Sequence, residues 1–418
     1  MGKIGIIILL VLCLTLLLLT GCMINTVTPE KASGNLENQE DINQSSNNSQ
    51  NSSTGLVEEP VIEEDTEATG TVYPQKWATG DGTVENPWAN DCIQKAYDFA
   101  PAGGTIFLRA GYYQLAGVLN ISKKINIIGE GMGKTIIKTA DANGFYTTSA
   151  NYVSIKNLTI DGDAQTDGTE NMSCISFNNS DYELLEDIEA KNSGYYGVHT
   201  FQVNHSSFQN IHSHDNYRHG LHPGSNTTGR NKYNIYRDIY AWDNGVNGFD
   251  DRGSSGDPNE QMYNVYDNLQ CWDNGSHGIA IADQRSGVIS NSSASGNGKT
   301  GIRVYDVEDW NIHDCSTTLN GEEGLASHLS KNVNLTNIIA KNNGYGISLF
   351  GCSNIVLTTC LSYDDRETPL QAYGLELWDT NTGISLLNCG LTPTATGEIY
   401  NPNGVAVKVI TEKMLAKL

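Results

Sequence analysis

The sequence has few basic residues for its length. It carries 25 Lys and Arg against 48 Asp and Glu in 418 residues, which gives a formal net charge of −23. Binding to nucleic acid needs a basic surface, so this balance predicts that nucleic acid is not a partner. An acidic substrate would need a local basic patch or bound cations to offset the same charge.

Paired cysteines are also lacking. Of the nine cysteines, Cys13 and Cys22 belong to the N-terminal segment, and the remaining seven form no CxxC pair. An odd number leaves at least one thiol unpaired, so a disulfide framework is not expected. Cys271 and Cys315 fall in strand-like positions and are interpreted as small core residues.

One long apolar run is present at the N-terminus, from Ile4 to Leu19, and it is followed by Thr20, Gly21 and Cys22. A single positive charge, an apolar stretch and a small residue before cysteine are typical of a secretory signal. The ending resembles a lipoprotein box, which makes Cys22 the expected lipidation site. The alternative is an uncleaved anchor helix, although about 17 residues is marginal for crossing a bilayer. Both predict an exported, membrane-anchored protein at the cell surface.

The remaining chain divides by composition. Residues 1–22 are the expected signal peptide, and residues 23–70 are rich in Asn, Ser, Gln and Glu, which predicts a disordered tether. Residues 71–150 are expected to hold an N-terminal cap and the first rungs. The repeats described next occupy residues 151–410, and residues 411–418 are expected to form a C-terminal cap.

A short phrase repeats seven times: a turn usually built on Asn and Gly, then a glycine followed by alternating apolar residues. These second glycines are Gly197, Gly220, Gly248, Gly278, Gly301, Gly324 and Gly346, with Gly374 in a diverged eighth copy, at steps of 23, 28, 30, 23, 23, 22 and 28 residues. A period of this length with short strands is typical of a solenoid. Three short strands and three turns per rung predict an all-β fold, a right-handed parallel β-helix.

Two features of the repeats and caps predict structural roles. Residues 90–99 have helical apolar spacing behind Asn90 or Asp91, which predicts a short N-terminal capping helix. Six asparagines stand four residues before the second glycine, and their stacked amides are expected to form a ladder. They are Asn216, Asn244, Asn274, Asn297, Asn320 and Asn342.

Residues two and four beyond each second glycine should face solvent, because side chains alternate along a strand. The central row, two beyond, reads His199, His222, Asp250, Ala280, Arg303, Ala326 and Ser348. The distal row, four beyond, reads Phe201, Gly224, Arg252, Ala282, Tyr305, His328 and Phe350. The corner row, one before each glycine, reads Tyr196, His219, Asn247, His277, Thr300, Glu323 and Tyr345. Rungs lie about 4.8 Å apart, so His199, His222 and Asp250 should form a column.

Chemistry-bearing residues concentrate on these rungs. Six of the nine histidines fall between His199 and His222, and two long steps, of 28 and 30 residues, follow directly, with extra residues near 227–232 and 254–260. Insertions in repeat proteins gather on the binding face. The rungs at Gly324 and Gly346 instead carry mostly Ala, Ser and Phe, so the site is expected between Gly197 and Gly301.

The opening at residues 77–83, the run at residues 104–113 and the rungs resemble the pectate-lyase-like superfamily of secreted β-helices. That superfamily includes polysaccharide lyases, uronate epimerases, glycoside hydrolases and proteins without known activity. The stretches 219–223, 243–249 and 301–305 are similar to mannuronan C5-epimerases. In that family the corner position is a tyrosine, followed by Asp-Pro-His. In this chain the corner position is His219, and the three later positions are His222, Pro223 and Gly224. Only the proline is therefore shared with the family pattern.

The resemblance implies a polysaccharide substrate, and the residues suit a lyase or C5-epimerase acting on uronate. Both reactions begin by removing the proton beside a uronate carboxylate, which needs a base and cationic stabilisation of the enolate. The expected base is His222 or His199, the carboxylate is held by Arg252 or Arg303, and the acid is Tyr196 or Tyr305. The catalytic candidates are His199, His222, Asp250, Arg252, Tyr196 and His219, and the substrate-binding candidates are His277, Asp283, Arg303 and Tyr305.

Three alternatives stay open. A glycoside hydrolase of polygalacturonase type would use Asp250 with Asp283, because Asp251 should point to the opposite face of the strand from Asp250. A metal site would use His199, His222 and Asp250 for a transition metal, or add Asp251 and Asp283 to hold Ca²⁺. A non-catalytic glycan-binding or adhesive β-helix would stack sugars on Trp242, Trp272, Trp310 and tyrosines, although the shared repeat position of Trp242 and Trp272 favours half-buried packing.

Overall fold

The computed structural model describes the chain from Gly70 to Ile410 with gaps. The described ranges are 70–89, 91–139, 143–162, 173–224, 231–253, 263–392 and 394–410. The expected signal peptide with Cys22, the tether, the C-terminal cap and most of the two insertions lie outside the described residues. Within these ranges, no helix has the length and apolarity needed to span a bilayer.

The N-terminal cap precedes the first rungs. It comprises β1 (Thr71–Val72), the 3₁₀ helix η1 (Pro74–Trp77) and α2 (Cys92–Phe99). The expected capping helix is confirmed, and it buries Cys92, Ile93 and Tyr97. Asp91 is the N-cap residue, but its side chain makes no capping hydrogen bond. The helix therefore depends on its buried face rather than on a cap.

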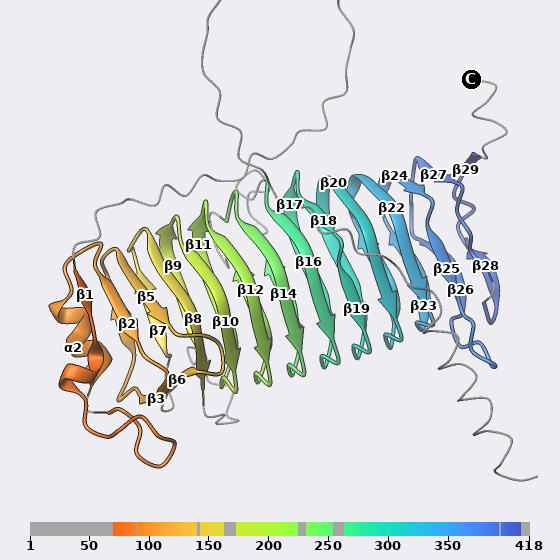
Figure 1. Cartoon of the computed structure of the whole chain (residues 1–418). Coiled ribbons are helices and arrows are strands. Elements are labelled where there is room, and N and C mark those ends of the chain that lie inside the picture. The colour runs from red at the N-terminus through yellow and green to blue at the C-terminus, as the bar shows by residue number, and fades with distance from the viewer. Residues whose placement is uncertain are drawn as a thin grey trace, which may run out of the picture. The chain divides into compact units, whose positions relative to one another are not determined.

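Consecutive rungs form parallel strands in register, and the described chain is a parallel β-helix (Figure 1). One face, named here the site sheet, consists of β4 (Leu119–Ile121), β7 (Phe145–Thr148), β9 (Ile175–Asp181), β11 (Tyr196–Asn204), β13 (His219–Gly224), β15 (Phe249–Arg252), β17 (Ile279–Arg285), the first part of β20 (Ile302–Thr318), β21 (Glu323–His328), β23 (Tyr345–Phe350), β26 (Tyr373–Trp378) and β28 (Gly397–Tyr400).

The other faces are built from the remaining strands, several of which are long and bend between two faces. They comprise β2 (Thr105–Leu108), β3 (Gly111–Gln114), β5 (Ile125–Gly129), β6 (Thr135–Lys138), β8 (Val153–Asp161), β10 (Leu184–Lys191), β12 (Ser207–His214), β14 (Ile235–Trp242), β16 (Val265–Trp272), β18 (Val288–Ser290), β19 (Ser293–Ser295), β22 (Lys331–Lys341), β24 (Ser353–Thr358), β25 (Leu361–Tyr363), β27 (Ile384–Leu387) and β29 (Val407–Ile410). An Asn or Asp with positive φ, such as Asp187 or Asn210, lies at the bend in most of these rungs. These residue types tolerate that conformation best after glycine. The bend gives each rung its third side.

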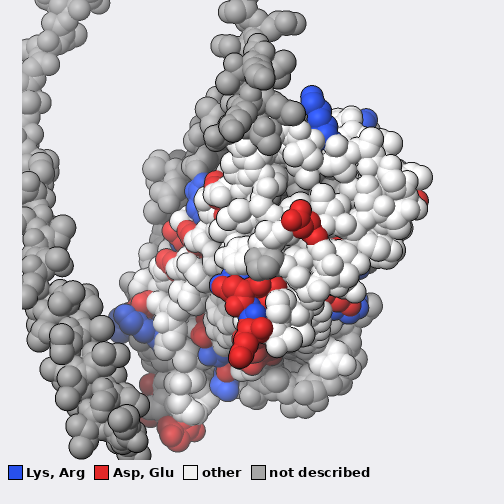
Figure 2. All heavy atoms as spheres, turned by 90° about the vertical axis from the view of Figure 1, so that its right-hand side faces the viewer, with Lys and Arg blue, Asp and Glu red and all other residues white. Residues whose placement is uncertain are grey.

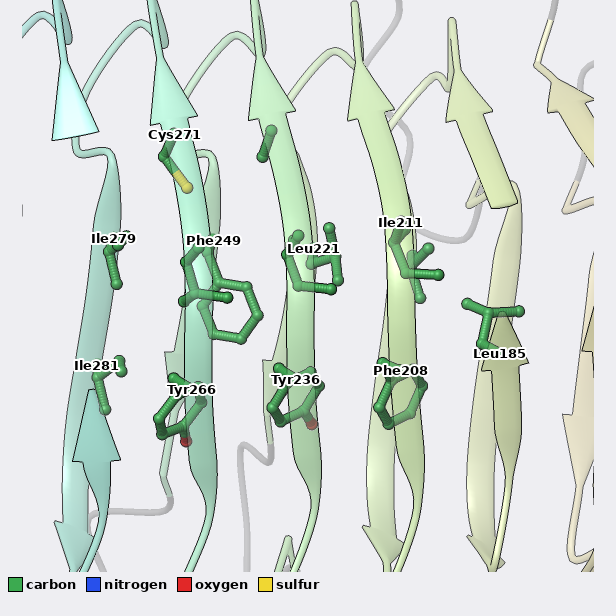
Figure 3. Close-up of a cluster of buried hydrophobic side chains, with 14 of the residues drawn as sticks. Leu185, Phe208, Ile211, Leu221, Tyr236, Phe249, Tyr266, Cys271, Ile279 and Ile281 are labelled. Atoms are coloured by element: carbon green, nitrogen blue, oxygen red, sulfur yellow. The ribbon is translucent and has the colours of Figure 1, made fainter. Parts of the chain in front are cut away.

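The core is a set of stacked inward rows. Phe208, Tyr236 and Tyr266 lie above one another in successive rungs, with ring centroids 4.9 and 5.5 Å apart (Figure 3). Leu221, Phe249 and Ile279 form a neighbouring row and are fully buried. Each rung covers the apolar side chains of the next, which is how a solenoid builds a continuous core.

A carboxyl group lies inside this core. Asp251 points inward, is fully buried and accepts a 2.6 Å hydrogen bond from the Tyr266 hydroxyl. The Asn231 amide approaches it at 3.3 Å, and Tyr266 also lies 2.8 Å from Gln284 Oε1. Burial raises the pKa of Asp251 to about 7, despite these hydrogen bonds. Asp250 and Asp251 therefore face opposite sides of one strand, as predicted.

The asparagine ladder is present, with one correction. The amides of Asn216, Asn244, Asn274, Asn297 and Asn320 each donate a 2.9 Å hydrogen bond to the amide oxygen of the next rung. The last acceptor is Asn343, whereas Asn342 was predicted. That rung is one residue shorter, so Asn342 takes the positive-φ turn position instead and donates to Asp365.

The repeated glycines allow the rungs to approach. A Cβ on Gly275 would lie 2.2 Å from the main-chain oxygen of Gly245, and one on Gly248 would lie 2.8 Å from the Asn274 amide nitrogen. Both distances are far inside van der Waals contact. The glycines are thus required by the neighbouring rung and by the asparagine ladder.

Candidate functional site

Strand register aligns the candidate residues along the site sheet. His199 lies opposite His222, and the pairing of Leu221 with Phe249 brings Asp250 next in the central row. Asp250 is followed by Ala280 and Arg303. The column expected from the glycine spacing is therefore formed, with each side chain placed by its own rung.

Aromatic rings pack together at the N-terminal part of this column. The His199 and His222 rings are stacked with centroids 5.6 Å apart, and Tyr196 lies 4.5 Å from His222 and 5.3 Å from His219. Burial lowers the pKa of His199 and of His219 to about 3, so both rings are neutral at neutral pH. Burial also raises the pKa of Tyr196 far above its usual value, so its hydroxyl stays protonated.

The tautomer of His222 is set by the next rung. His222 Nδ1 lies 2.8 Å from the main-chain oxygen of Asp250, and a carbonyl can only accept a hydrogen bond. Nδ1 therefore carries a hydrogen, and Nε2 of the neutral ring has a free lone pair. A Cβ on Gly224 would lie 3.5 Å from that Nε2, so glycine keeps the space beside it open.

The tautomer of His219 is set in the same manner by Asn247. The main-chain N–H of Asn247 donates to His219 Nδ1 at 3.2 Å, so the hydrogen of the neutral ring is on Nε2. That nitrogen faces Asp250 Oδ2 at 3.5 Å. The Asn247 amide also donates to Asp250 Oδ1 at 2.9 Å, and its oxygen accepts the His277 N–H at 2.9 Å. Asn247, a corner-row residue not counted among the candidates, therefore orients three of them.

Asp250 is a buried carboxylate at the centre of the cluster. Its side chain is 0% exposed; Oδ2 lies 3.1 Å from His222 Nδ1, and Oδ1 accepts a hydrogen bond from Arg252 Nε at 3.0 Å. Burial alone would raise the pKa of Asp250, but the interactions with His222, His219 and Arg252 outweigh it and hold the pKa well below its usual range. Asp250 is thus ionised throughout the pH range in which a protein is folded.

His219, His222 and Asp250 have the spacing of a metal site, since one ligand atom from each lies within 4.8 Å of the others. The hydrogen-bond partners oppose that use. Both ring nitrogens facing Asp250 carry hydrogens, whereas a metal ligand must present a lone pair. Asp251 is enclosed in the core, and Asp283 lies beyond the column, so neither can complete a Ca²⁺ site with Asp250. These hydrogen bonds do not favour a metal between His219, His222 and Asp250, and the Ca²⁺ set with Asp251 and Asp283 is not brought together. The transition-metal set with His199 stays a prediction.

A depression opens on the C-terminal side of Asp250. It is open to solvent, and its space of about 200 Å³ includes open solvent. The depression spans the rungs that begin at Gly248, Gly278 and Gly301. The middle rung has the smallest outward side chains, so Ala280 and Ala282 form the floor, and two arginines and a tyrosine border it. The lining residues are Asp250, Arg252, Ala280, Ile281, Ala282, Arg303 and Tyr305. The guanidinium of Arg303 lies 5.7 Å from the Tyr305 ring centroid.

Asp283 and His277 lie at the edges of this arrangement. Ala280, not Asp283, is opposite Asp250, and Asp283 falls at the turn that ends the outward rows. An Asp250–Asp283 pair for hydrolysis is therefore not formed. His277 lies beside Asn247 in the corner row, and burial, with the charge of Arg303, lowers its pKa to about 4.

The remaining candidates lie elsewhere on the solenoid. His205 stacks between Tyr182 and Tyr233 at a corner, while His212 and His214 belong to β12 on another face. His214 lies 2.6 Å from Asp215 and 3.1 Å from Glu189. Trp242 and Trp272 stack on one another, and Trp310 is fully buried. Only half of the clustered histidines thus contribute to the site.

A family model described as "Right handed beta helix region" matches residues 259–414. The chain is a right-handed parallel β-helix. Among solved structures, the A-module of mannuronan C-5 epimerase AlgE6 from Azotobacter vinelandii aligns with a TM-score of 0.62 and 18% identity over 81% of this chain and 99% of that one. The AlgE4 A-module aligns with a TM-score of 0.61 and 19% identity over 82% and 97%. At this identity the likeness concerns the fold.

Curated relatives share sequence over a limited region. Mannuronan C5-epimerase AlgE1 of Azotobacter vinelandii is 31% identical over 144 residues, which is 29% of this chain and 10% of that protein. Alginate lyase 7 of the same organism is 30% identical over 173 residues, which is 34% of this chain and 19% of that protein. The aligned region is thus a small part of each of these relatives. The similarity to mannuronan C5-epimerases expected from the sequence is confirmed, and it is local.

Proposed function

We propose that this chain is a polysaccharide-active enzyme that removes the proton beside the carboxylate of a uronate residue, as a lyase or a C5-epimerase. The observation that carries the proposal is the depression between Arg252 and Arg303, which is lined by Asp250, the carboxylate that His222 faces. The local similarity to mannuronan epimerases and an alginate lyase supports the same substrate class.

The arginines supply the cationic part of the site. Arg252 and Arg303 lie two rungs apart, about 10 Å along the axis, on either side of the alanine floor. A sugar residue seated over Ala280 and Ala282 has its carboxylate within reach of either guanidinium. Positive charge there favours the enolate that forms when the neighbouring carbon loses its proton.

His222 is the proposed base. Its Nε2 lone pair is free, and Gly224 leaves room beside it. After it takes the proton, the imidazolium keeps its Nδ1 hydrogen on the Asp250 main chain and lies 3.1 Å from the ionised carboxylate, which stabilises the new charge. In epimerisation a proton returns to the opposite face of the sugar carbon, and the proposed donor is Tyr305, which lines the depression.

In elimination, the glycosidic C–O bond breaks and the leaving oxygen takes up a proton. Tyr305 is the better placed donor because it lines the depression. Tyr196 is 8% exposed and packed among the histidine rings, so its hydroxyl is less accessible to substrate. Its proposed part is to hold the His222 ring in place.

We further propose that the protein acts outside the cell, held at the membrane by lipid on Cys22. The support is the apolar N-terminal run that ends at a small residue and cysteine. Metabolic labelling with a lipid analogue would test this, and labelling that persists in Cys22→Ala would contradict it.

The enzymatic proposal is tested with purified wild type, His222→Ala and Asp250→Asn on alginate and polygalacturonate. Three products are measured: the ultraviolet absorbance of unsaturated uronate, the C5 configuration by NMR, and new reducing ends. His222→Ala should lose at least about 100-fold of the activity, the usual effect of removing a general base. The matched control is His313→Ala, which removes a half-exposed histidine that pairs with Asp314 away from the site sheet.

The assays separate the possible reactions. Unsaturated product identifies a lyase, inverted C5 without cleavage identifies an epimerase, and reducing ends without unsaturation identify a hydrolase. Wild type that yields none of these, or that matches both variants, would refute the enzymatic proposal.

A further inference from the structure

The distal row of the site sheet becomes aromatic beyond the depression. After Arg252 and Ala282 it continues through Tyr305, His328, Phe350 and Trp378, one residue per rung in consecutive rungs. The row spans about 14 Å from Tyr305 to Trp378, at about 4.8 Å per rung. It begins at the wall of the depression, so it extends the same surface toward the C-terminal rungs.

The rings of this row are inclined to one another, and the C-terminal ones are exposed. The planes are inclined by 52° between Tyr305 and His328 and by 33° between His328 and Phe350, whereas Trp242 and Trp272 on another face are within 3° of parallel. Phe350 and Trp378 are both 40% exposed. Exposed rings that are inclined to one another can offer their faces to a ligand.

The neighbouring central row adds a floor of small or buried side chains. Ala326, Ser348 and Glu376 follow Arg303 in the central row and are at most 3% exposed, because the larger side chains on either side cover them. Burial raises the pKa of Glu376, whose carboxylate oxygen accepts a 2.8 Å hydrogen bond from Ser348. Tyr345 in the corner row is 38% exposed and borders the floor opposite Phe350.

Positive charge ends where the aromatic row begins. The strands β21, β23 and β26 contain 18 residues and no Lys or Arg, and they carry Glu323 and Glu376. Seen from the C-terminal end, most of the surface is uncharged, and acidic side chains form its main charged cluster (Figure 2). A row of uronate carboxylates would find no counter-charge on these strands.

We propose that Tyr305, His328, Phe350 and Trp378 form a binding track for uncharged sugar residues of the chain whose anionic residue binds between Arg252 and Arg303. The binding of the anionic residue between the arginines rests on the proposed function, whereas the binding of uncharged sugars rests on the aromatic row alone. The apolar C–H face of a sugar ring packs on an aromatic face, and one rung is about as long as one sugar residue. The substrate is then a heteropolysaccharide, in which uronate alternates with or interrupts neutral sugars.

The test is affinity electrophoresis in gels that contain one soluble glycan each: galactomannan, xyloglucan and mixed-linkage glucan as uncharged probes, alginate and polygalacturonate as charged ones. All proteins carry His222→Ala, so that no glycan is degraded during the run. The double variant Phe350→Ala/Trp378→Ala should bind at least one uncharged glycan about 10-fold more weakly than its parent. Arg252→Ala/Arg303→Ala should retain that binding and lose retardation by the polyuronates.

The matched control is Val356→Ala/Leu361→Ala, which removes two exposed apolar side chains from β24 and β25 on another face. It should bind all five glycans like its parent. The track is overturned if no uncharged glycan retards the parent, or if the aromatic double variant binds these glycans as well as the parent does. If the double variant loses as much binding to the polyuronates as to the uncharged glycans, the preference of the track for uncharged sugars is overturned.

A conservative variant distinguishes the loss of a sugar contact from misfolding of the protein. Trp378→Phe keeps an aromatic face but removes one indole, so it should bind normally and lose most of the fluorescence change that an uncharged glycan causes. An unchanged fluorescence response would place the sugar elsewhere and overturn the proposal. Failure of the catalytic assay with a positive binding result would instead leave the track in place and remove the enzymatic proposal.

Discussion

The main-chain oxygen of Asp250 accepts a 2.8 Å hydrogen bond from His222 Nδ1, the ring that precedes it in the central row. A backbone carbonyl cannot move or change protonation, so it fixes the tautomer of His222 more firmly than a side chain would. The Asp250 carboxylate, 3.1 Å from the same nitrogen, then supplies the charge. One residue thus provides both the orientation and the electrostatics of the proposed base.

Asn247 should act as a positioning residue. Asn247→Ala removes its 2.9 Å hydrogen bond to Asp250 and its acceptor for the His277 N–H. We expect kcat to fall about 10- to 100-fold with little change in KM, because hydrogen bonds to charged groups contribute about 1.5–3 kcal/mol. Thr300→Val is the control: it removes a similarly buried corner-row hydrogen bond, to Glu323, away from Asp250. Equal losses in the two variants would argue against positioning.

Arg303 should bind the substrate carboxylate. Arg303→Ala leaves the Asp250 hydrogen bonds intact and removes one cation from the depression, so kcat/KM on a polyuronate should fall at least about 10-fold. Arg303→Lys should recover part of the loss. Arg237→Ala, which removes an arginine paired with Asp267 on another face, should leave the kinetics unchanged. Steady-state kinetics over a range of ionic strength would show the effect, and full activity in Arg303→Ala would contradict it.

Asp251 should make stability depend on pH. Its pKa is about 7 in the folded chain and near 3.9 when unfolded, so the folded state binds the extra proton between these values. Stability is therefore expected to fall as pH rises from 4 through 7. Asn at this position is neutral at every pH, like the protonated acid, and its side-chain oxygen can still accept the hydrogen bond from Tyr266. Asp251→Asn should raise the melting temperature at pH 8 more than at pH 5, as calorimetry would show.

Chelation should leave activity unchanged. His219 and His222 present N–H groups to Asp250, and this arrangement opposes metal ligation. Activity would be measured after dialysis against EDTA and again after addition of Ca²⁺, Mn²⁺ or Zn²⁺ in separate samples. A loss on dialysis that one of these ions restores would contradict the hydrogen-bond assignment.

The asparagine ladder should contribute strongly to stability. Asn274→Ala leaves the buried amide of Asn244 without its acceptor and Asn297 without its donor, so we expect a loss of about 2–5 kcal/mol, from about 1–3 kcal/mol per unsatisfied buried group. Asn342→Ala lies outside the ladder and should cost much less. Thermal melts of the two variants give the comparison, and similar melting temperatures would count against the ladder.

The sequence predicted the fold and the column because both depend on spacing. The second glycines mark the start of each site strand, so counting two residues onward finds His199, His222 and Asp250 without coordinates. The same counting misplaced Asn342, because one rung is a residue shorter and the turn absorbs the difference. A repeat therefore predicts register well and turn geometry less well.

Other parts of the site depend on contacts that spacing does not contain. Asn247 has a corner position in common with six unrelated residues, and only its hydrogen bonds to Asp250 and His277 distinguish it. Trp378 was missed because its rung diverges from the repeat. The sequence places the site before Gly324 and does not single out the aromatic row, because residue types alone do not show how the ring planes are inclined.

The asparagine ladder has a direction, and that direction limits how the molecule can change length. Every amide in it donates toward the C-terminal end, and Gln371 closes the series by accepting the main-chain N–H of Asn343 at 3.3 Å. A rung copied or deleted between Asn216 and Asn343 leaves each remaining donor facing an acceptor. A chain cut within the ladder would bury an amide with no partner. Recombination can therefore lengthen or shorten this protein internally by whole rungs, while its ladder ends must be kept.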